Sequence, residues 1–102
     1  MKVLDHEPWC WFLVADEERL LLDVNCNHSA FGYSWLIELN PSEVGRYRKA
    51  GRDYITQLAD LIQYSAPAVK GSTSPFIDRK LGKEQADAVH RTIMKWRSDQ
   101  DS

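Results

Sequence analysis

The sequence lacks the features that mark membrane, secreted and nucleotide-binding proteins. None of its apolar runs approaches the roughly 18 residues of a membrane span, and its first residues do not combine a basic segment, an apolar core and a cleavage site. Its five glycines are scattered, so no glycine-rich phosphate loop is present. We therefore expect a cytoplasmic protein whose two cysteines, Cys10 and Cys26, are reduced and buried, since cytosolic disulfides are rare.

The composition indicates neither disorder nor a second domain. Hydrophobic residues make up 43% and charged residues 27% of the 102 residues, which is ordinary for a globular protein. A chain of this length buries roughly 60–68% of its unfolded surface and needs no disulfide or metal to fold. The sequence therefore predicts a single domain over residues 1–98 and a frayed tail over residues 99–102.

Alternating apolar residues between Phe31 and Leu39 predict a strand. One face of that strand carries every second residue, namely Phe31, Tyr33, Trp35, Ile37 and Leu39. An Asn-Pro-Ser-Glu segment follows the strand. Asn40 can cap a helix with its side chain, Pro41 is tolerated at the first helical position, and Glu43 favours the positive end of a helix. The strand is therefore predicted to feed directly into a helix.

Two apolar runs precede this strand, with a charged cluster between them. Residues 9–15 and 20–26 flank an Asp-Glu-Glu-Arg segment, which predicts a hairpin. The register that pairs Ala15 with Leu20 also pairs, on the same face, Leu13 with Leu22, Trp11 with Val24, and Trp9 with Cys26. The other face then carries Val14 with Leu21, and Phe12 with Asp23. Together with residues 31–39, these runs predict a three-stranded antiparallel meander.

Helical spacing dominates the second half of the chain. Val44 and Tyr47 predict a short helix from residue 41, which Gly51 either ends or merely bends. Two further amphipathic faces follow, the first formed by Tyr54, Ile55, Leu58, Ala59, Leu61 and Ile62 and the second by Ala86, Val89, Ile93 and Trp96. The residues between them are typical of a loop, except that residues 76–81 predict a short edge strand.

These elements predict a two-layer α+β fold. One layer is an antiparallel meander of three or more strands over residues 9–39. The other layer contains two or three helices from residues 41–66 and 83–98, which pack on the aromatic face of the meander. That face is expected to carry Trp9, Trp11 and Trp35.

Metal-binding and catalytic residue types are present, but not in a characteristic pattern. The candidate metal ligands are His6, Cys10, Cys26 and His28, whose spacing differs from the paired knuckles of zinc sites. The predicted register also places the two cysteines on opposite faces of the sheet. The candidate acid–base and nucleophilic residues are Asp5, His6, Glu7, Cys10 and Asp23, without a nucleophile elbow or a Cys-His-Asn signature. We therefore expect no metal, no other cofactor and no enzymatic activity.

A basic cluster on the first predicted helix favours an alternative role in nucleic-acid binding or regulation. Arg46, Arg48, Lys49 and Arg52 surround Tyr47 and Tyr54, a combination that can contact phosphates and stack bases. The two tyrosines, however, align with the core stripe of the helix. An isoelectric point near 5.9 is also unlike that of a basic nucleic-acid binder. Nucleic-acid binding is therefore the second hypothesis.

Several segments together resemble a known family. The chain contains WCWFLV from residue 9, then LLDVNCN, YSWLIELN and PSEVGRYRKAGRDYITQLADLI. This order over residues 9–66 resembles the small immunity proteins of bacterial polymorphic toxin systems, including contact-dependent growth inhibition. The most family-like positions are Glu43, Tyr47, Gly51, Leu58, Ala59 and Ile62. The resemblance implies a cytosolic protein that binds one cognate toxin domain, in many such systems a basic nuclease, and neutralises it without catalysis of its own.

The distribution of charge agrees with such a partner. Residues 1–45 hold two basic and eight acidic side chains, a balance of −6, whereas residues 46–102 hold eleven basic and seven acidic ones, a balance of +4. Complementary charge speeds association and discriminates among partners. The predicted toxin-binding residues lie in the 16–18 turn and the flanking strands: Asp16, Glu17, Glu18, Asp23 and Glu38. If the second face of the sheet is open, Phe12 and Leu36 form an apolar patch beside two of these carboxylates.

Overall fold

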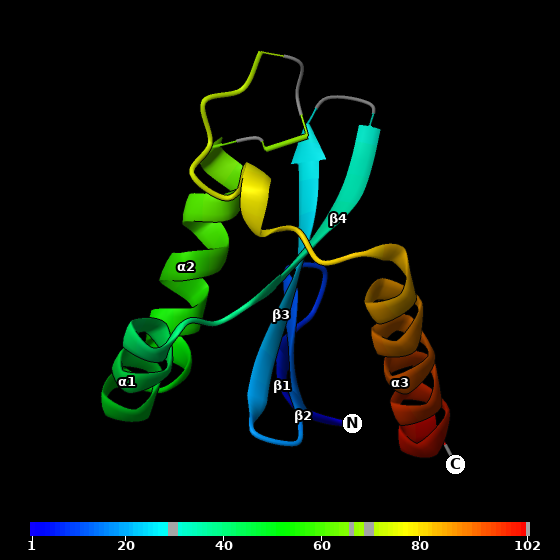
Figure 1. The fold of residues 1–102 in the computed structure, drawn as a ribbon. Helices are drawn as coiled ribbons and strands as arrows, with labels where there is room; N and C mark the ends of the chain where they lie inside the picture. Colours follow the sequence, from blue (N-terminus) through cyan, green and yellow to red (C-terminus); the bar gives the residue numbers. More distant parts are fainter. Residues whose placement is uncertain (29–30, 66, 69–70, 102) are drawn as a thin grey trace.

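The structure is a computed structural model that describes residues 1–28, 31–65, 67–68 and 71–101. Within these residues, four strands come first and the helices follow (Figure 1). The strands are β1 (Lys2–Glu7), β2 (Trp11–Asp16), β3 (Arg19–His28) and β4 (Phe31–Glu38). The helices are α1 (Pro41–Ala50), α2 (Arg52–Ser65), the short 3-10 helix η1 (Ile77–Arg79) and α3 (Lys83–Asp101), which extends past its predicted end at residue 98. The predicted α+β class, an antiparallel meander packed against helices, is confirmed.

The strands form an antiparallel sheet in the order β1-β2-β3-β4. The predicted hairpin register is confirmed by the pairs Ala15 with Leu20, Leu13 with Leu22, and Trp11 with Val24. β1 was not predicted. It pairs with β2 through a bulge between Val3 and Asp5, and three of its six residues, Lys2, Asp5 and Glu7, are charged. A short, charged and bulged strand at the edge of a sheet has little of the alternation by which strands are identified.

Trp9 is not part of the sheet, contrary to the prediction. The N–H of Cys10 donates to the carbonyl of Glu7 at 2.9 Å, so a turn joins β1 to β2. Pro8 occupies the second position of that turn, and Trp9 takes the left-handed conformation at the third position, with φ of 68°. Strand pairing with β3 therefore begins only at Trp11.

Helices cover both faces of the sheet (Figure 1). α1 and α2 lie against the aromatic face, whose core contains Trp11, Leu13, Leu22, Val24, Cys26, Trp35, Ile37, Leu39, Ile55, Leu58, Ala59, Ile62 and Phe76. α3 lies against the opposite face, over a smaller core formed by Val3, Val14, Leu21, Leu36, Val89 and Ile93. The prediction that residues 83–98 share the aromatic face is therefore wrong. The patch around Phe12 and Leu36 is consequently covered by α3.

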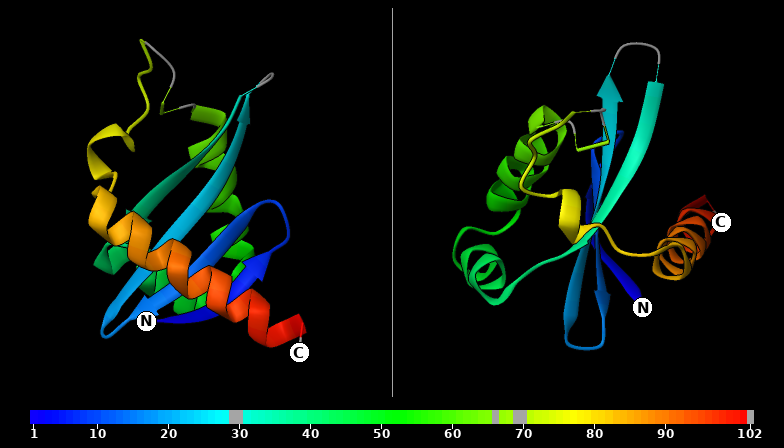
Figure 2. Two further views of the ribbon diagram at one scale, coloured as in Figure 1. Left: turned by 90° about the vertical axis from the view of Figure 1, so that its right-hand side faces the viewer. Right: turned by 45° about the horizontal axis from the view of Figure 1, so that its top comes forward.

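The chain reaches the second face by crossing the edge of the sheet at β4 (Figure 2). Residues 76–81, predicted as a strand, instead form η1 and then a single bridge between Lys80 and Ile37. The N–H of Leu81 donates to the carbonyl of Leu36 at 2.9 Å. The segment is thus fastened to β4 immediately before α3 begins.

Arg79 of η1 ties this crossing to the start of α1. Its guanidinium donates to both carboxylate oxygens of Glu43, at 2.9 and 2.5 Å, and to the carbonyl of Glu38 at 2.8 Å. Glu43 also accepts from the N–H of Asn40, whose side chain accepts from the N–H of Glu43, so the predicted helix start is a capping box. Burial opposes ionisation of Glu43, but these hydrogen bonds more than offset it and lower its pKa.

Gly51 separates α1 from α2. Its φ is 68°, and its N–H donates to the carbonyl of Tyr47 at 2.7 Å. A residue with positive φ just past the last helical turn ends a helix, and glycine adopts that conformation without steric cost. Of the two outcomes that the sequence left open, the structure shows a break.

Trp35→Ala should lower the free energy of unfolding by about 3–5 kcal/mol, the usual cost of truncating a large buried aromatic side chain. The indole is buried on the aromatic face and donates its Nε1–H to the carbonyl of Phe76 at 3.0 Å. Trp35→Phe is the matched control, because it keeps a buried ring and loses that hydrogen bond, and its loss should be smaller. Denaturant unfolding measures both variants. A negligible midpoint shift for the alanine variant would show that this face of β4 is misassigned.

Arg79→Met should destabilise the protein by about 1.5–3 kcal/mol at neutral pH, because it leaves the buried carboxylate of Glu43 without its cation. The lowered pKa of Glu43 means that its contribution is present above the ordinary value of 4.5 and is lost as the pH falls through the folded-state pKa. The difference in unfolding free energy between wild type and variant should therefore shrink in acid. Arg19→Met, which removes the partly exposed ion pairs with Asp16 and Glu38, should cost clearly less than Arg79→Met. A difference that stays constant into acid would contradict the assignment.

Candidate functional site

α3 crosses the second face of the sheet obliquely (Figure 2, left) and leaves a groove of about 400 Å³ along one side. We call this the α3 groove. It is lined by Trp9 and Cys10 of the β1–β2 turn, Trp11 and Phe12 of β2, Asp23 and Asn25 of β3, Ser34 of β4, and His90, Ile93, Met94 and Arg97 of α3. Segments far apart in the sequence therefore form one concave surface, which contains two of the candidate acid–base and nucleophilic residues, Cys10 and Asp23.

Asp23 forms the polar floor of the α3 groove. β3 holds it between Phe12 of β2 and Leu36 of β4, and only 8% of its surface is exposed. Its Oδ2 lies 3.6 Å from Nε2 of His90, and its Oδ1 has no hydrogen-bond partner among the residues that the structure describes. Burial raises the pKa of this carboxyl, and the neighbouring His90 opposes the rise.

Two large apolar side chains are exposed on the rim of the groove. Trp9 is 84% exposed and Met94 is 68% exposed. The backbone beneath Trp9 is held in place, because Asn25 donates its Nδ2–H to the carbonyl of Trp9 at 3.1 Å and its backbone N–H to the carbonyl of Cys10 at 2.8 Å. A side chain presented from a fixed backbone loses less entropy when a partner covers it.

An aromatic cluster lies beside the groove near the end of α3. His6 stacks on Phe12 with ring centroids 5.3 Å apart and contacts Trp96 edge-on at 4.6 Å. The guanidinium of Arg97 lies 5.2 Å from the centroid of the Phe12 ring. A second depression, of about 310 Å³, lies over these residues and shares Trp9 with the α3 groove. The apolar surface therefore continues from the rim towards β1.

Most of the acidic residues predicted to bind a toxin lie at the β2–β3 hairpin and the end of β4. Asp16 and Glu38 both pair with Arg19, at 2.6 and 3.4 Å. Glu17 and Glu18 are exposed in the turn, and neither forms an ion pair with any other residue in the described part of the chain. Of the five predicted carboxylates, Asp23 alone lines the α3 groove.

The candidate metal ligands are separated in space. Cys26 is buried on the aromatic face, whereas His6 faces α3. Cys10 is exposed in the β1–β2 turn, so the prediction that both cysteines are buried is wrong for Cys10. The side chain of His28 lies outside the described residues. Across residues 1–28, 31–65, 67–68 and 71–101, no three His, Cys, Asp or Glu side chains are grouped so as to hold an ion.

Arg52 does not contribute a free cation to the predicted basic cluster, because it is paired with carboxylates of β1. Its guanidinium binds the carboxylate of Glu7 at 2.6 Å and lies 3.8 Å from that of Asp5, so α2 is tied to β1. The same guanidinium lies 5.6 Å from the ring centroid of Trp11. Two of the candidate acid–base residues, Asp5 and Glu7, are therefore partners of an ion pair on the aromatic face.

The remaining basic residues of that cluster, Arg46, Arg48 and Lys49, are exposed on α1. The two tyrosines among them, Tyr47 and Tyr54, are half-buried and pack against the core of the aromatic face, as predicted. Neither ring is therefore a fully exposed platform on which a base could stack beside these basic residues.

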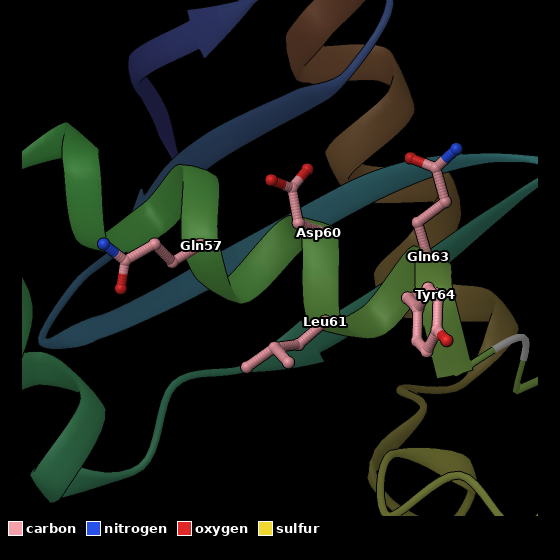
Figure 3. A pocket seen from close by; sticks show the side chains of 5 residues that line it. All are labelled: Gln57, Asp60, Leu61, Gln63 and Tyr64. Carbon is pink, nitrogen blue, oxygen red and sulfur yellow. The ribbon is translucent and has the colours of Figure 1, made fainter.

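α2 also displays apolar side chains outward (Figure 3). Leu61, which helical spacing assigned to the buried stripe, is 59% exposed, and Tyr64 is 91% exposed. A depression of about 910 Å³ lies over them and is bordered by Gln57, Asp60 and Gln63. All of these lining residues belong to α2, so within the described residues no second element contributes to this surface.

His90, Met94 and Arg97 line the α3 groove but belong to no motif in the sequence. They recur at intervals of four and three residues, which places them along one side of α3, next to the core stripe that contains Val89 and Ile93. Sequence reasoning could have identified these three residues only as a line of side chains next to the core stripe. Such a line shows which side of the helix they occupy, but it does not show which strand lies opposite.

No protein-family model, curated protein or solved structure matches this chain. Within the residues described, no helix is both long and apolar enough to cross a membrane. The features that bear on function are therefore the α3 groove, its buried carboxylate and its exposed rim.

Proposed function

We propose that this protein binds a partner protein through the α3 groove and its rim, and that the partner is a toxin domain which it neutralises in the cytosol. The observation that carries the proposal is the pair of large apolar side chains, Trp9 and Met94, exposed beside the groove that contains Asp23. Tryptophan and methionine are enriched at protein interfaces, and tryptophan is among the residues that contribute most to binding free energy.

A stable complex would cover more than the two rim residues. A standard interface buries on the order of 800 Å² on each partner. The rim, the groove and the neighbouring depression over Trp96 adjoin one another on the same face and share Trp9. Neutralisation by a protein inhibitor requires only that this complex cover or distort the toxin, so no catalytic group of this chain is needed.

The exposed carboxylates at the β2–β3 turn support a basic partner. Glu17 and Glu18 are exposed, and neither forms an ion pair among the described residues. Exposed charge of one sign raises the rate of encounter with a partner of the opposite sign. The resemblance to immunity proteins supplies the class of partner, and these charges agree with a basic domain.

The first test is co-expression with the adjacent toxin-like reading frame, expected immediately upstream, followed by co-purification and a growth assay. The double variant Trp9→Ala/Met94→Ala should weaken the complex by about 2 kcal/mol or more, the level of an interface hot spot, and reduce protection. Leu61→Ala/Tyr64→Ala on α2 is the matched control, because it also removes two exposed apolar side chains and should leave affinity unchanged.

Failure of the wild-type protein both to co-purify and to protect cells would sink the proposal. Equal losses of affinity for the two double variants would show that the α3 groove is not the interface. A shift of RNA or DNA at near-physiological salt, abolished by reversing Arg46 and Arg48, would favour the nucleic-acid alternative instead.

Glu17→Lys/Glu18→Lys should slow association with the toxin domain and change dissociation little, because exposed charges outside the contact surface act on the rate of encounter. The effect should diminish as salt is added, since screening shortens the range of the attraction. Asp53→Lys/Asp60→Lys on α2 is the control with the same change in net charge and should slow association less. Stopped-flow kinetics measures both. Equal slowing by the two double variants would show that the position of the acidic turn does not matter.

A further inference from the structure

The two most buried carboxylates among the described residues differ sharply in the number of hydrogen bonds that they receive. Asp23 and Glu43 are each 8% exposed. Glu43 receives three hydrogen bonds, two from Arg79 and one from the N–H of Asn40. Asp23 has one oxygen without a hydrogen-bond partner in the described part of the chain and another that lies 3.6 Å from His90, beyond hydrogen-bond distance. An ionised carboxylate buried in this way is costly, because it has lost water without gaining donors.

The polar side chains of the α3 groove that the structure describes do not hydrogen-bond to Oδ1 of Asp23. Asn25, its nearest neighbour on the same face of β3, uses its amide N–H to hold the carbonyl of Trp9. Arg97, the arginine that lines the α3 groove, lies over the ring of Phe12. The contact with His90 is electrostatic only when the imidazole is protonated, and half of that side chain is exposed.

We propose that the α3 groove receives an arginine side chain of the protein partner, with its guanidinium on the carboxylate of Asp23 and its aliphatic stem between Trp9 and Met94. This inference rests on the proposed function and specifies the partner chemistry at that same site. The guanidinium replaces the imidazole of His90 beside the carboxylate, and no hydrogen bond is broken because none joins the two side chains at 3.6 Å.

The chemistry of the groove favours guanidinium over other cations. Guanidinium donates two parallel N–H groups that match the two oxygens of a carboxylate, and it is less strongly hydrated than ammonium, so it enters a largely desolvated site at lower cost. Its flat face also stacks on aromatic rings, and Trp9 supplies such a ring at the entrance. Pairing with a cation favours the ionised form of Asp23 and therefore lowers its pKa from the raised value of the free protein.

The test uses two probes of matched shape, butylguanidinium and neutral butylurea, titrated into the whole protein and followed by NMR at the indole N–H of Trp9 and the methyl group of Met94. Butylguanidinium should give saturable shifts with a Kd of about 1–10 mM, and butylurea should bind at least about tenfold more weakly. Asp23→Asn should abolish the difference between the probes. Asp60→Asn, which alters an exposed carboxylate on α2 outside the groove, should preserve it. Equal responses to both probes, or an undiminished response of Asp23→Asn, would overturn the inference.

A second measurement tests the contact between guanidinium and Asp23 even if Asp23→Asn does not fold. The pKa of the Asp23 carboxyl, followed by carbon NMR in the wild-type protein, should fall when butylguanidinium is present and stay unchanged with butylurea. An unchanged pKa at saturating butylguanidinium would contradict the contact.

With the toxin partner, Asp23→Asn should weaken binding by about 30-fold or more, mainly through faster dissociation, as expected for truncating a buried charge pair. Equal affinities for wild type and Asp23→Asn would refute the arginine contact and leave the proposed protein interface standing. A partner that does not bind the wild-type protein would refute the proposed function, and the probe titration would still decide what the groove accepts.

Discussion

Arg79 holds the point at which the chain passes from one face of the sheet to the other. Its guanidinium joins three places that are distant in sequence: the end of β4, the capping box of α1 and the segment that leads to α3. Because Glu43 is buried, the ion pair cannot be exchanged for water without a cost, which fixes where the crossing lies. α3 begins from that fixed position and packs on the second face through Val89 and Ile93.

The parts of the fold that depend on local periodicity could be read from the sequence. The two apolar runs that flank the Asp-Glu-Glu-Arg segment predicted the register of β2 with β3, and the Asn-Pro-Ser-Glu segment predicted the start of α1. The face covered by α3 could not be read in the same way, because an apolar stripe on a helix does not indicate which side of a sheet it meets. Phe12, Val14, Leu21 and Leu36 together form a second apolar face, and that fact argues for a second covering element.

The candidate site was harder to predict, because spatial neighbours decide its chemistry. The acidic half and the basic half of the sequence are not separate surfaces, since Arg52 and Arg79 from the second half neutralise Glu7 and Glu43 in the first. Asp23 was identified as a carboxylate of interest, but its burial and its neighbour His90 come from the docking of α3. Trp9 could be assigned to the turn only if Pro8, a typical turn residue, were given more importance than the apolar run that follows it.

The α3 groove joins residues 9–12 to residues 90–97, so its walls are synthesised at widely separated times. The strands, α1 and α2 leave the ribosome first and can bury the aromatic face, whereas the opposite face stays uncovered until α3 docks. In that interval Leu21 and Leu36 are exposed to association with other incomplete chains. A partner that recognises the groove therefore selects chains that have been synthesised through α3 and have closed both faces, so binding reports on the completion of folding.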